Sequence, residues 1–161
     1  MAFWKAFIEL QKRGLCRSIG VSNFTIENLK ELEEKYDVLP AINQVEFHPY
    51  HYQKELLEYC NSKNIIIEAY SPLVHAKRMD EPRLIAISDE LGKTPAQVLI
   101  RWAIQRGMVV LPKSVNQDRI VENFAVFDFD ISNSLMKRLD DLDERYVTCW
   151  DPHNPPPYAP V

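Results

Sequence analysis

The sequence predicts an α/β fold that amounts to part of a (β/α)8 TIM barrel, and three observations support this prediction. Four short apolar segments rich in β-branched residues alternate with segments of helical periodicity. Such alternation is typical of right-handed βαβ units, which place parallel strands side by side. A complete barrel needs roughly 250 residues, whereas this chain has 161. We therefore expect about four βα units with two extra helices, in a single domain over residues 1–161.

The four predicted strands are short, and each is accompanied by polar side chains near its end. They are Arg17 to Val21 (RSIGV), Ala41 to Phe47 (AINQVEF), Ile65 to Tyr70 (IIIEAY) and Met108 to Pro112 (MVVLP). Functional residues of βα barrels lie at the carboxyl ends of the strands. A four-stranded open sheet of the flavodoxin type is the alternative, but its ligand loop usually follows the first strand. Here the richest polar site follows the fourth strand.

Helical spacing and capping residues predict helices before, between and after these strands. The helical segments are residues 1–14, a run capped by Thr25, and residues 52–64, 81–93, 94–107, 116–124 and 132–142. The clearest signals are Thr94 as N-cap, Pro95 at the first helical position and Gly107 after the last turn. Residues 143–161 contain a proline-rich run and are expected to form an irregular tail.

Composition and charge exclude several classes of function. The formal net charge of -4, with basic residues scattered among acids, argues against a nucleic-acid partner. No apolar run approaches the roughly 20 residues that span a bilayer, and the amino-terminal segment lacks the pattern of a signal peptide. We therefore expect a soluble, cytoplasmic protein with no membrane partner. Cys16, Cys60 and Cys149 are widely spaced, which predicts buried free thiols, and no metal-ligand spacing occurs.

The stretch LPKSVNQDRIVEN, which follows the fourth predicted strand, is a candidate anion site. Lys113 and Ser114 end the strand, and the start of the next helix offers unpaired backbone N–H groups and a positive dipole end. Arg119, Glu122 and Asn123 are spaced to share one helical face and could reach one ligand. A solvated helix start with a surface Arg–Glu pair explains this spacing equally well. Glycine-rich phosphate loops of the Rossmann and P-loop kinds are absent from the sequence.

Five motifs along the chain resemble those of the aldo-keto reductase family. In order they are GVSNF, NQVEFHPY, EAYSPL, KTPAQVLIRW and LPKSVNQDRIVEN. Five motifs in the family's order are far more specific than any one of them. The resemblance runs from about Trp4 to Leu142 and corresponds to the second half of that family's barrel. It implies an NADPH-dependent oxidoreductase that reduces small carbonyl substrates, aldehydes and ketones, by hydride transfer without a metal.

The same resemblance implies a set of cofactor contacts, residue by residue. Ser22, Asn23 and Gln44 match the family's contacts to the nicotinamide carboxamide, and Tyr70 matches the aromatic residue that stacks on the nicotinamide. Ser71 and Leu73 match residues along the pyrophosphate. Lys113, Ser114 and Arg119 match residues that hold the 2′-phosphate, and Val115 lies beside them in the sequence. Glu122 and Asn123 match residues at the adenine.

Structural explanations stand beside some of these assignments. Tyr70 could be a strand-end tyrosine whose ring lies in the core, and Ser22 and Asn23 could cap the helix that begins near Thr25. Trp150 lies in a region like the family's variable substrate loop, so it is a candidate for substrate contact. His48 and Trp102, outside this set, are expected to serve structure and packing.

The resemblance also implies that no catalytic residue lies in this sequence. The family's general acid is a tyrosine supported by a lysine, an aspartate and a histidine, and all four come from the first half of the barrel. We therefore expect residues 1–161 to be inactive alone, and to need an N-terminal barrel half or to self-associate through open sheet edges. The alternative is a non-catalytic nucleotide-binding or interaction protein derived from that family.

Overall fold

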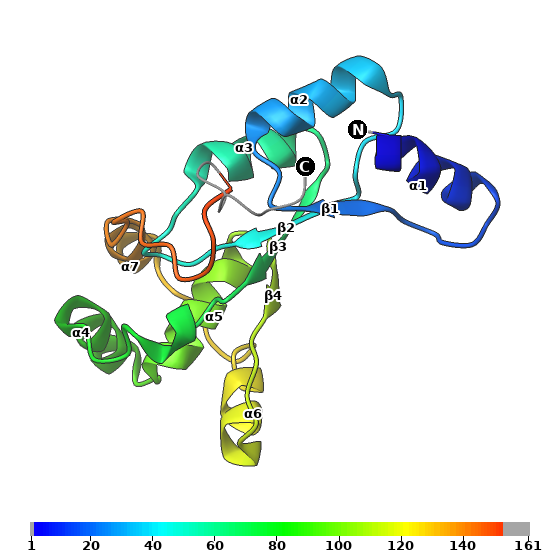
Figure 1. Ribbon diagram of the computed structural model, residues 1–161. Helices are drawn as coiled ribbons and strands as arrows, with labels where there is room; N and C mark the ends of the chain where they lie inside the picture. Colours follow the sequence, from blue (N-terminus) through cyan, green and yellow to red (C-terminus); the bar gives the residue numbers. More distant parts are fainter. Residues whose placement is uncertain (1, 153–161) are drawn as a thin grey trace. The chain divides into compact units, whose positions relative to one another are not determined.

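The computed structural model describes residues 2–152, in which strands alternate with helices as Figure 1 shows. The strands are β1 (Gly20–Ser22), β2 (Ile42–Glu46), β3 (Ile66–Tyr70) and β4 (Val109–Leu111). The helices are α1 (Ala2–Lys12), α2 (Ile26–Lys35), α3 (Lys54–Ser62), α4 (Pro82–Leu91), α5 (Pro95–Gln105), α6 (Gln117–Phe124) and α7 (Asn133–Asp140). Each of these elements falls within or close to a segment predicted from the sequence.

The strands form one sheet whose spatial order, β1-β2-β3-β4, is the order of the chain. β1 pairs with β2 in parallel, with Gly20 opposite Ile42 and Ser22 opposite Gln44. Consecutive parallel neighbours are the arrangement of a βα barrel, whereas a flavodoxin-like sheet reverses its strand order. The order therefore agrees with a partial barrel, and the flavodoxin-like alternative is wrong.

The first and last strands are shorter than the sequence predicts. β1 and β4 have three residues each, against five in each predicted segment. Both lie at an end of the strand order among the described residues, so each has a ladder of hydrogen bonds on one side only. A strand that is paired on one side only has fewer residues in regular pairing. In β4 the side chains of Val109 and Leu111 are exposed.

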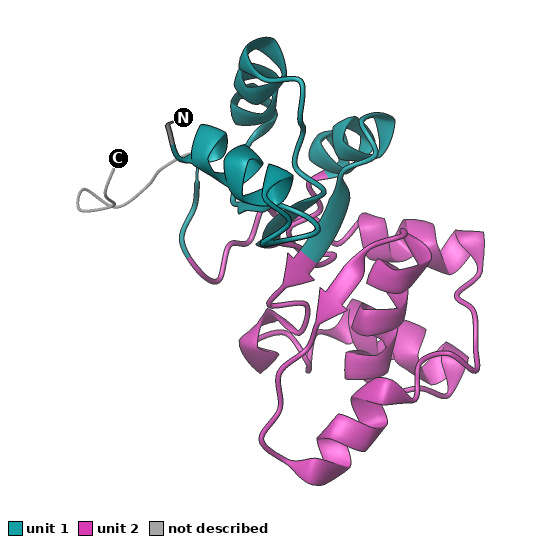
Figure 2. Ribbon diagram, turned by 90° about the vertical axis from the view of Figure 1, so that its right-hand side faces the viewer, with its two compact units in different colours: residues 1–45, 54–68, 150–161 teal, residues 46–53, 69–149 magenta. Residues whose placement is uncertain are grey.

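The described chain divides into two compact units, coloured separately in Figure 2. Of the described residues, the first unit comprises 2–45, 54–68 and 150–152. Its core contains Trp4 of α1 with Leu29 and Leu32 of α2, all of them almost fully buried. The indole Nε1 of Trp4 donates a hydrogen bond to the Val38 carbonyl at 2.9 Å, which satisfies the one polar atom of this buried ring.

The second unit comprises residues 46–53 and 69–149, and aromatic rings form the centre of its core. Phe47 and Trp102 are fully buried with ring centroids 6.0 Å apart, and Tyr52 meets Trp102 edge-on at 5.4 Å. The Nε1 of Trp102 donates to Asp140 Oδ1 at 2.8 Å. The prediction that Trp102 serves packing is confirmed, and its hydrogen bond ties α5 to α7.

The predicted helix caps are present in the structure. Thr25 and Thr94 each form a capping box, in which the threonine hydroxyl accepts from the backbone three residues later. Asn116 caps α6 in the same way. Because Thr25 is the N-cap of α2, the explanation that Ser22 and Asn23 cap that helix is wrong.

The loop after β3 contains a short 3-10 helix, η1 (Val74–Ala76), that the sequence did not predict. Val74, His75 and Ala76 all have positive φ, between 51° and 61°. This left-handed conformation is unfavourable for L-residues, and most of all for a β-branched residue such as Val74. Residues 143–152 form no regular element, as predicted, and the remaining residues of the predicted tail, 153–161, lie outside the described part.

The cysteines are less buried than the sequence predicts. Cys60 is buried, but Cys16 is partly exposed and Cys149 is exposed, so the expectation of buried thiols is wrong for these two. Cys149 lies in the irregular segment after α7, where sequence periodicity gives no information about burial.

Within residues 2–152 no helix is both long and apolar enough to cross a membrane. The same residues contain no group of three His, Cys, Asp or Glu side chains that could hold a metal ion.

Candidate functional site

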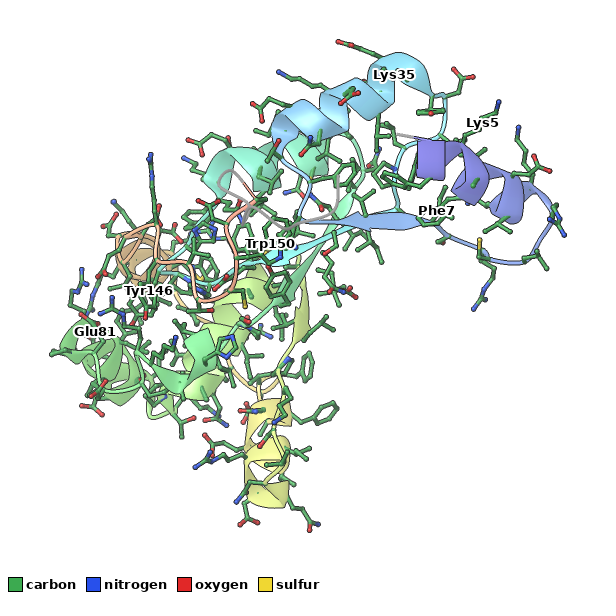
Figure 3. The ribbon with its side chains drawn as sticks, in the orientation of Figure 1. Lys5, Phe7, Lys35, Glu81, Tyr146 and Trp150 are labelled. Carbon is green, nitrogen blue, oxygen red and sulfur yellow. The ribbon has the colours of Figure 1, made fainter. Side chains whose placement is uncertain are left out.

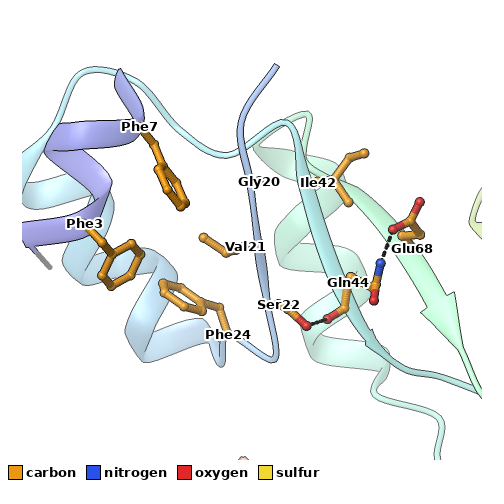
Figure 4. A pocket seen from close by; sticks show the side chains of 9 residues that line it. All are labelled: Phe3, Phe7, Gly20, Val21, Ser22, Phe24, Ile42, Gln44 and Glu68. Carbon is orange, nitrogen blue, oxygen red and sulfur yellow. Dashed lines mark hydrogen bonds between the residues drawn. The ribbon is translucent and has the colours of Figure 1, made fainter. Parts of the chain in front are cut away.

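The carboxyl ends of β1 and β2 bring three of the predicted site residues together in the first unit. Ser22 Oγ donates to the Gln44 carbonyl at 3.0 Å, and the backbone N–H of Asn23 donates to the same oxygen at 2.9 Å. Asn23 has a positive φ of 58°, a conformation that asparagine tolerates better than most residues. The Nε2 of Gln44 donates to Glu68 Oε2 at 2.5 Å (Figure 4). Glu68 therefore belongs to this polar cluster, although no motif in the sequence predicts its role there.

A cavity of about 470 Å³ lies beside this cluster, within the size range of small-molecule sites. Phe3 and Phe7 of α1 line one side with Phe24, and Phe3 meets Phe24 edge-on at 6.4 Å. Figure 4 shows these rings gathered near Val21, and Figure 3 marks Phe7 on α1. The whole lining is Phe3, Phe7, Gly20, Val21, Ser22, Phe24, Ile42, Gln44 and Glu68. The cavity thus combines an aromatic side with the hydroxyl, amide and carboxylate of the polar cluster.

The end of β3 places Tyr70, Ser71 and Leu73 in the second unit. Tyr70 is partly buried, and its carbonyl accepts a hydrogen bond from the backbone N–H of Phe47 at 3.3 Å. Ser71 has a positive φ of 50°, which turns the chain sharply at the strand end. Its hydroxyl lies 3.0 Å from His75 Nε2, so Ser71 is held by a residue of its own loop.

The end of β4 and the start of α6 expose two cations in the second unit. Lys113 and Arg119 are both exposed, and Val115 between them is 87% exposed. The Ser114 hydroxyl accepts from the Asn116 backbone N–H at 3.1 Å, and the Asn116 side chain accepts from the Arg119 N–H at 3.0 Å. The expectation of unpaired N–H groups at this helix start is therefore wrong for Arg119, because the N-cap side chain already bonds its N–H.

Glu122 is bonded to Thr94, the N-cap of α5, and to Gln97 of α5 inside the same unit. The Thr94 hydroxyl donates to Glu122 Oε1 at 2.5 Å, and Gln97 Nε2 donates to the Glu122 carbonyl at 3.2 Å. Asn123 is buried. The Glu122 carboxylate bonds to Thr94. Among the described side chains, no salt bridge joins Glu122 to the Arg119 guanidinium.

A buried carboxylate that the sequence analysis missed organises the segment after α7. Glu46, the last residue of β2, is 3% exposed and accepts from the Thr148 hydroxyl, the Thr148 N–H at 2.8 Å and the Cys149 N–H at 3.1 Å. The Nε2 of His48 lies 3.1 Å from the same carboxylate. Burial raises the pKa of Glu46, but these hydrogen bonds outweigh burial and lower the pKa to about 2. A signal was present in the sequence, since a glutamate inside an apolar strand needs partners.

Two tyrosines have phenol groups that are weaker acids than an ordinary tyrosine. Burial, assisted by the nearby charge of Glu81, raises the pKa of Tyr50. Burial together with a hydrogen bond to Glu33 raises the pKa of Tyr59 to about 12. Trp150, the candidate for substrate contact, is labelled in Figure 3 and is 42% exposed. It belongs to the first unit.

Known proteins are similar to this chain in sequence and in fold over most of its length. The model of the aldo/keto reductase family matches residues 1–144. Glyoxal reductase of Bacillus subtilis (strain 168) is 44% identical over 144 residues, which are 88% of this chain and 52% of the relative. Methylglyoxal reductase DkgA of Escherichia coli (strain K12) is 43% identical over 143 residues, again 88% of this chain and 52% of the relative.

A solved structure extends the similarity to three dimensions. The Bombyx mori aldo-keto reductase in complex with NADP superposes with a TM-score of 0.84 at 32% identity, covering 91% of this chain and 51% of that one. The chain spans about half the length of the curated relatives it matches. The predicted partial α/β barrel is confirmed by this likeness together with the strand order. The chain belongs to the aldo/keto reductase family.

Proposed function

We propose that this chain carries the NADPH-binding half of an oxidoreductase that reduces small aldehydes and ketones to alcohols. Residues 1–161 are assigned to the C-terminal half of the barrel, with residues 1–14 preceding its first strand and residues 143–161 as its tail. Relatives named glyoxal reductase and methylglyoxal reductase support a small carbonyl substrate. The NADP complex of a structural relative supports the cofactor, which supplies the hydride when bound.

The observation that carries this proposal is the exposed pair of cations after β4. Lys113 and Arg119 are exposed, and Glu122 is held by Thr94 instead of neutralising Arg119. A guanidinium with its charge available suits a phosphate group, which it can bind through two parallel hydrogen bonds. Lys113, Ser114 and Arg119 would hold the 2′-phosphate, and this group is what distinguishes NADPH from NADH. Val115, Glu122 and Asn123 complete the assignment at the adenosine.

The polar cluster of the first unit suits the carboxamide of the nicotinamide. Ser22, Asn23 and Gln44 offer a hydroxyl and two amides at the ends of neighbouring strands. A carboxamide has both a donor and an acceptor, and amide side chains can meet both requirements. In the second unit Tyr70 would stack on the ring, and Ser71 and Leu73 would lie along the pyrophosphate.

Proton donation is the part of the reaction to which we assign no residue of this chain. Reduction of a carbonyl by hydride needs an acid at the developing alkoxide, and a positioned acid typically contributes about 10² to 10⁴ in rate. The pKa values of Tyr50 and Tyr59 are raised, so neither phenol suits that role near neutral pH. We infer that residues 1–161 bind the cofactor and do not turn over substrate without a complementary barrel half.

Titration of purified residues 1–161 with NADPH and with NADH tests the cofactor assignment. Replacing Arg119 with Ala is expected to weaken NADPH binding by about 1.5 to 3 kcal/mol, the contribution of a hydrogen bond to a charged group, and to change NADH binding little. Arg13→Ala is the matched control, because it removes an exposed arginine that follows α1. Equal weakening for both cofactors by Arg119→Ala would show that this site does not recognise the 2′-phosphate.

Turnover is tested separately, by the loss of NADPH absorbance with a 2-oxoaldehyde as substrate. Residues 1–161 alone are expected to give the background rate, and addition of a separately expressed N-terminal barrel half of a relative is expected to raise it. Sustained turnover by the chain alone, abolished by replacing one of its own tyrosines with Phe, would contradict the assignment.

A further inference from the structure

The N-terminal capping box of α5 makes contacts that reach beyond its own helix. Within the box, the Thr94 hydroxyl accepts from the Gln97 backbone N–H at 3.3 Å, and the Gln97 side-chain oxygen accepts from the Thr94 N–H at 3.0 Å. These two bonds use only the acceptor oxygens of the two side chains. The hydroxyl hydrogen of Thr94 and the NH₂ group of Gln97 can still donate hydrogen bonds.

Both of these donors are directed to the end of α6. The Thr94 hydroxyl donates to Glu122 Oε1 at 2.5 Å. The Nε2 of Gln97 donates to the backbone carbonyls of Glu122 at 3.2 Å and of Ala125 at 3.0 Å. Asn123, the residue after Glu122, is buried. The capping box thus holds both the backbone and the carboxylate of Glu122.

Helical spacing offers the Glu122 carboxylate a second partner, Arg119. This arginine precedes Glu122 by three positions in α6, and at that spacing a guanidinium and a carboxylate are neighbours on the helix surface. Among the described side chains no salt bridge joins the two. Arg119 is exposed, so its guanidinium can reach a ligand in solvent. Thr94 and Arg119 are therefore alternative partners for one carboxylate, and the structure pairs it with Thr94.

We propose that Thr94 and Gln97 form a clamp that sets the preference for NADPH over NADH by keeping the Glu122 carboxylate away from Arg119. This role rests on the proposed function, in which Arg119 holds the 2′-phosphate. A carboxylate paired with the guanidinium would occupy N–H groups that the phosphate needs, and it would place a negative charge beside that anion. NADH lacks the 2′-phosphate and is insensitive to both effects. Thr94 and Gln97 are thus positioning residues that act through Glu122.

Thr94→Gly tests the clamp with little disturbance of α5. Glycine costs only a little as a replacement N-cap, so the helix stays capped while the hydroxyl is lost and no charge is added. The released carboxylate is expected to pair with Arg119. The ratio of NADPH affinity to NADH affinity should then fall by roughly two- to fivefold, the range of an exposed ion pair. Fluorescence titration of purified residues 1–161 with each cofactor measures this ratio.

Two further variants show whether Thr94 acts through Glu122. Thr94→Ser keeps the hydroxyl and should keep the ratio of the parent chain. Glu122→Gln has no carboxylate to release, so adding Thr94→Gly to that variant should leave its ratio unchanged. Any contact of Glu122 with the adenine is common to both cofactors and cancels in the ratio. An equal fall with glutamate and with glutamine at position 122 would refute the clamp.

Arg119→Ala in the same titrations separates the clamp from the proposed function. If Arg119→Ala lowers the ratio and Thr94→Gly does not, Arg119 recognises the 2′-phosphate and the clamp alone is overturned. If Arg119→Ala leaves the ratio unchanged, the cofactor assignment fails and the clamp fails with it. If Thr94→Gly does not fold, Glu122→Gln alone decides. A carboxylate held by Thr94 predicts an unchanged ratio for that variant, and a ratio raised twofold or more would overturn the proposal.

Discussion

Replacing Glu46 with Gln should detach the segment after α7 from β2 and change how stability depends on pH. The carboxylate accepts hydrogen bonds from Thr148, Cys149 and His48 and is almost fully buried. A glutamine keeps the shape and one acceptor oxygen, but its NH₂ group then faces groups that are themselves donors. The variant therefore loses several charge-assisted hydrogen bonds at once.

The size of the effect follows from the pKa of Glu46. That pKa falls from its usual 4.5 to about 2 in the folded chain, and each pKa unit is worth about 1.4 kcal/mol. The hydrogen-bonded carboxylate thus contributes about 3 kcal/mol to the free energy of unfolding at neutral pH. Because the folded pKa is lowered, this contribution is complete above about pH 4.5 and is lost as the pH falls toward 2. By pH 3 the unmodified chain should have lost about 2 kcal/mol through this group alone.

Urea unfolding at pH 6 and pH 3, followed by tryptophan fluorescence, measures the effect. Glu46→Gln should be less stable at pH 6 and should lose less stability between the two pH values than the parent. Glu58→Gln is the matched control, because Glu58 has a 65% exposed side chain and pairs with Lys54 only at 3.8 Å. That surface pair is worth about 0 to 1 kcal/mol. The reasoning fails if Glu46→Gln shows the same loss of stability between pH 6 and pH 3 as the parent. Thr148→Val, which removes one donor only, should cost about 1 kcal/mol.

Two further predictions concern α5 and its contacts with α6 and α7. Trp102→Phe keeps a buried ring but removes the hydrogen bond to Asp140, so it should cost about 1 to 3 kcal/mol in urea unfolding; an unchanged midpoint would show that this bond contributes nothing. Thr94→Ala removes the N-cap of α5 and the partner of Glu122, so it should lower stability by about 1 kcal/mol, while Thr94→Ser should restore most of the loss.

Sequence reasoning succeeded best where the interacting atoms are near one another in the chain. The capping boxes of Thr25 and Thr94 involve residues only three positions apart, so spacing alone identifies both partners. The strand order also followed from local information, because short connections between parallel strands leave few topologies open. The lengths of β1 and β4 were missed, since the number of paired residues depends on neighbours that local periodicity does not specify.

The cluster around Glu46 shows why other features could not be predicted. Its hydrogen bonds to Thr148 and Cys149 join residues 102 and 103 positions apart, and no spacing rule covers such a distance. Sequence reasoning could note a glutamate in an apolar strand, but it could not identify the donors.

The turn at Val74 was missed for a different reason. Positive φ is normally expected at glycine or asparagine, and here a valine adopts it because the fold holds it there.

The pair formed by Gln44 and Glu68 shows how the structure refines a residue that the sequence already identified. The motif marked Gln44 as a contact to an amide, but it left open which end of the side-chain amide faces a ligand. A carboxylate only accepts hydrogen bonds, so the contact of 2.5 Å requires the Gln44 nitrogen to face Glu68. The amide oxygen is then the end that can accept a hydrogen bond from a carboxamide NH₂ group. Glu68 thereby selects the orientation of Gln44, and with it the half of a nicotinamide amide that Gln44 would contact under the proposed function.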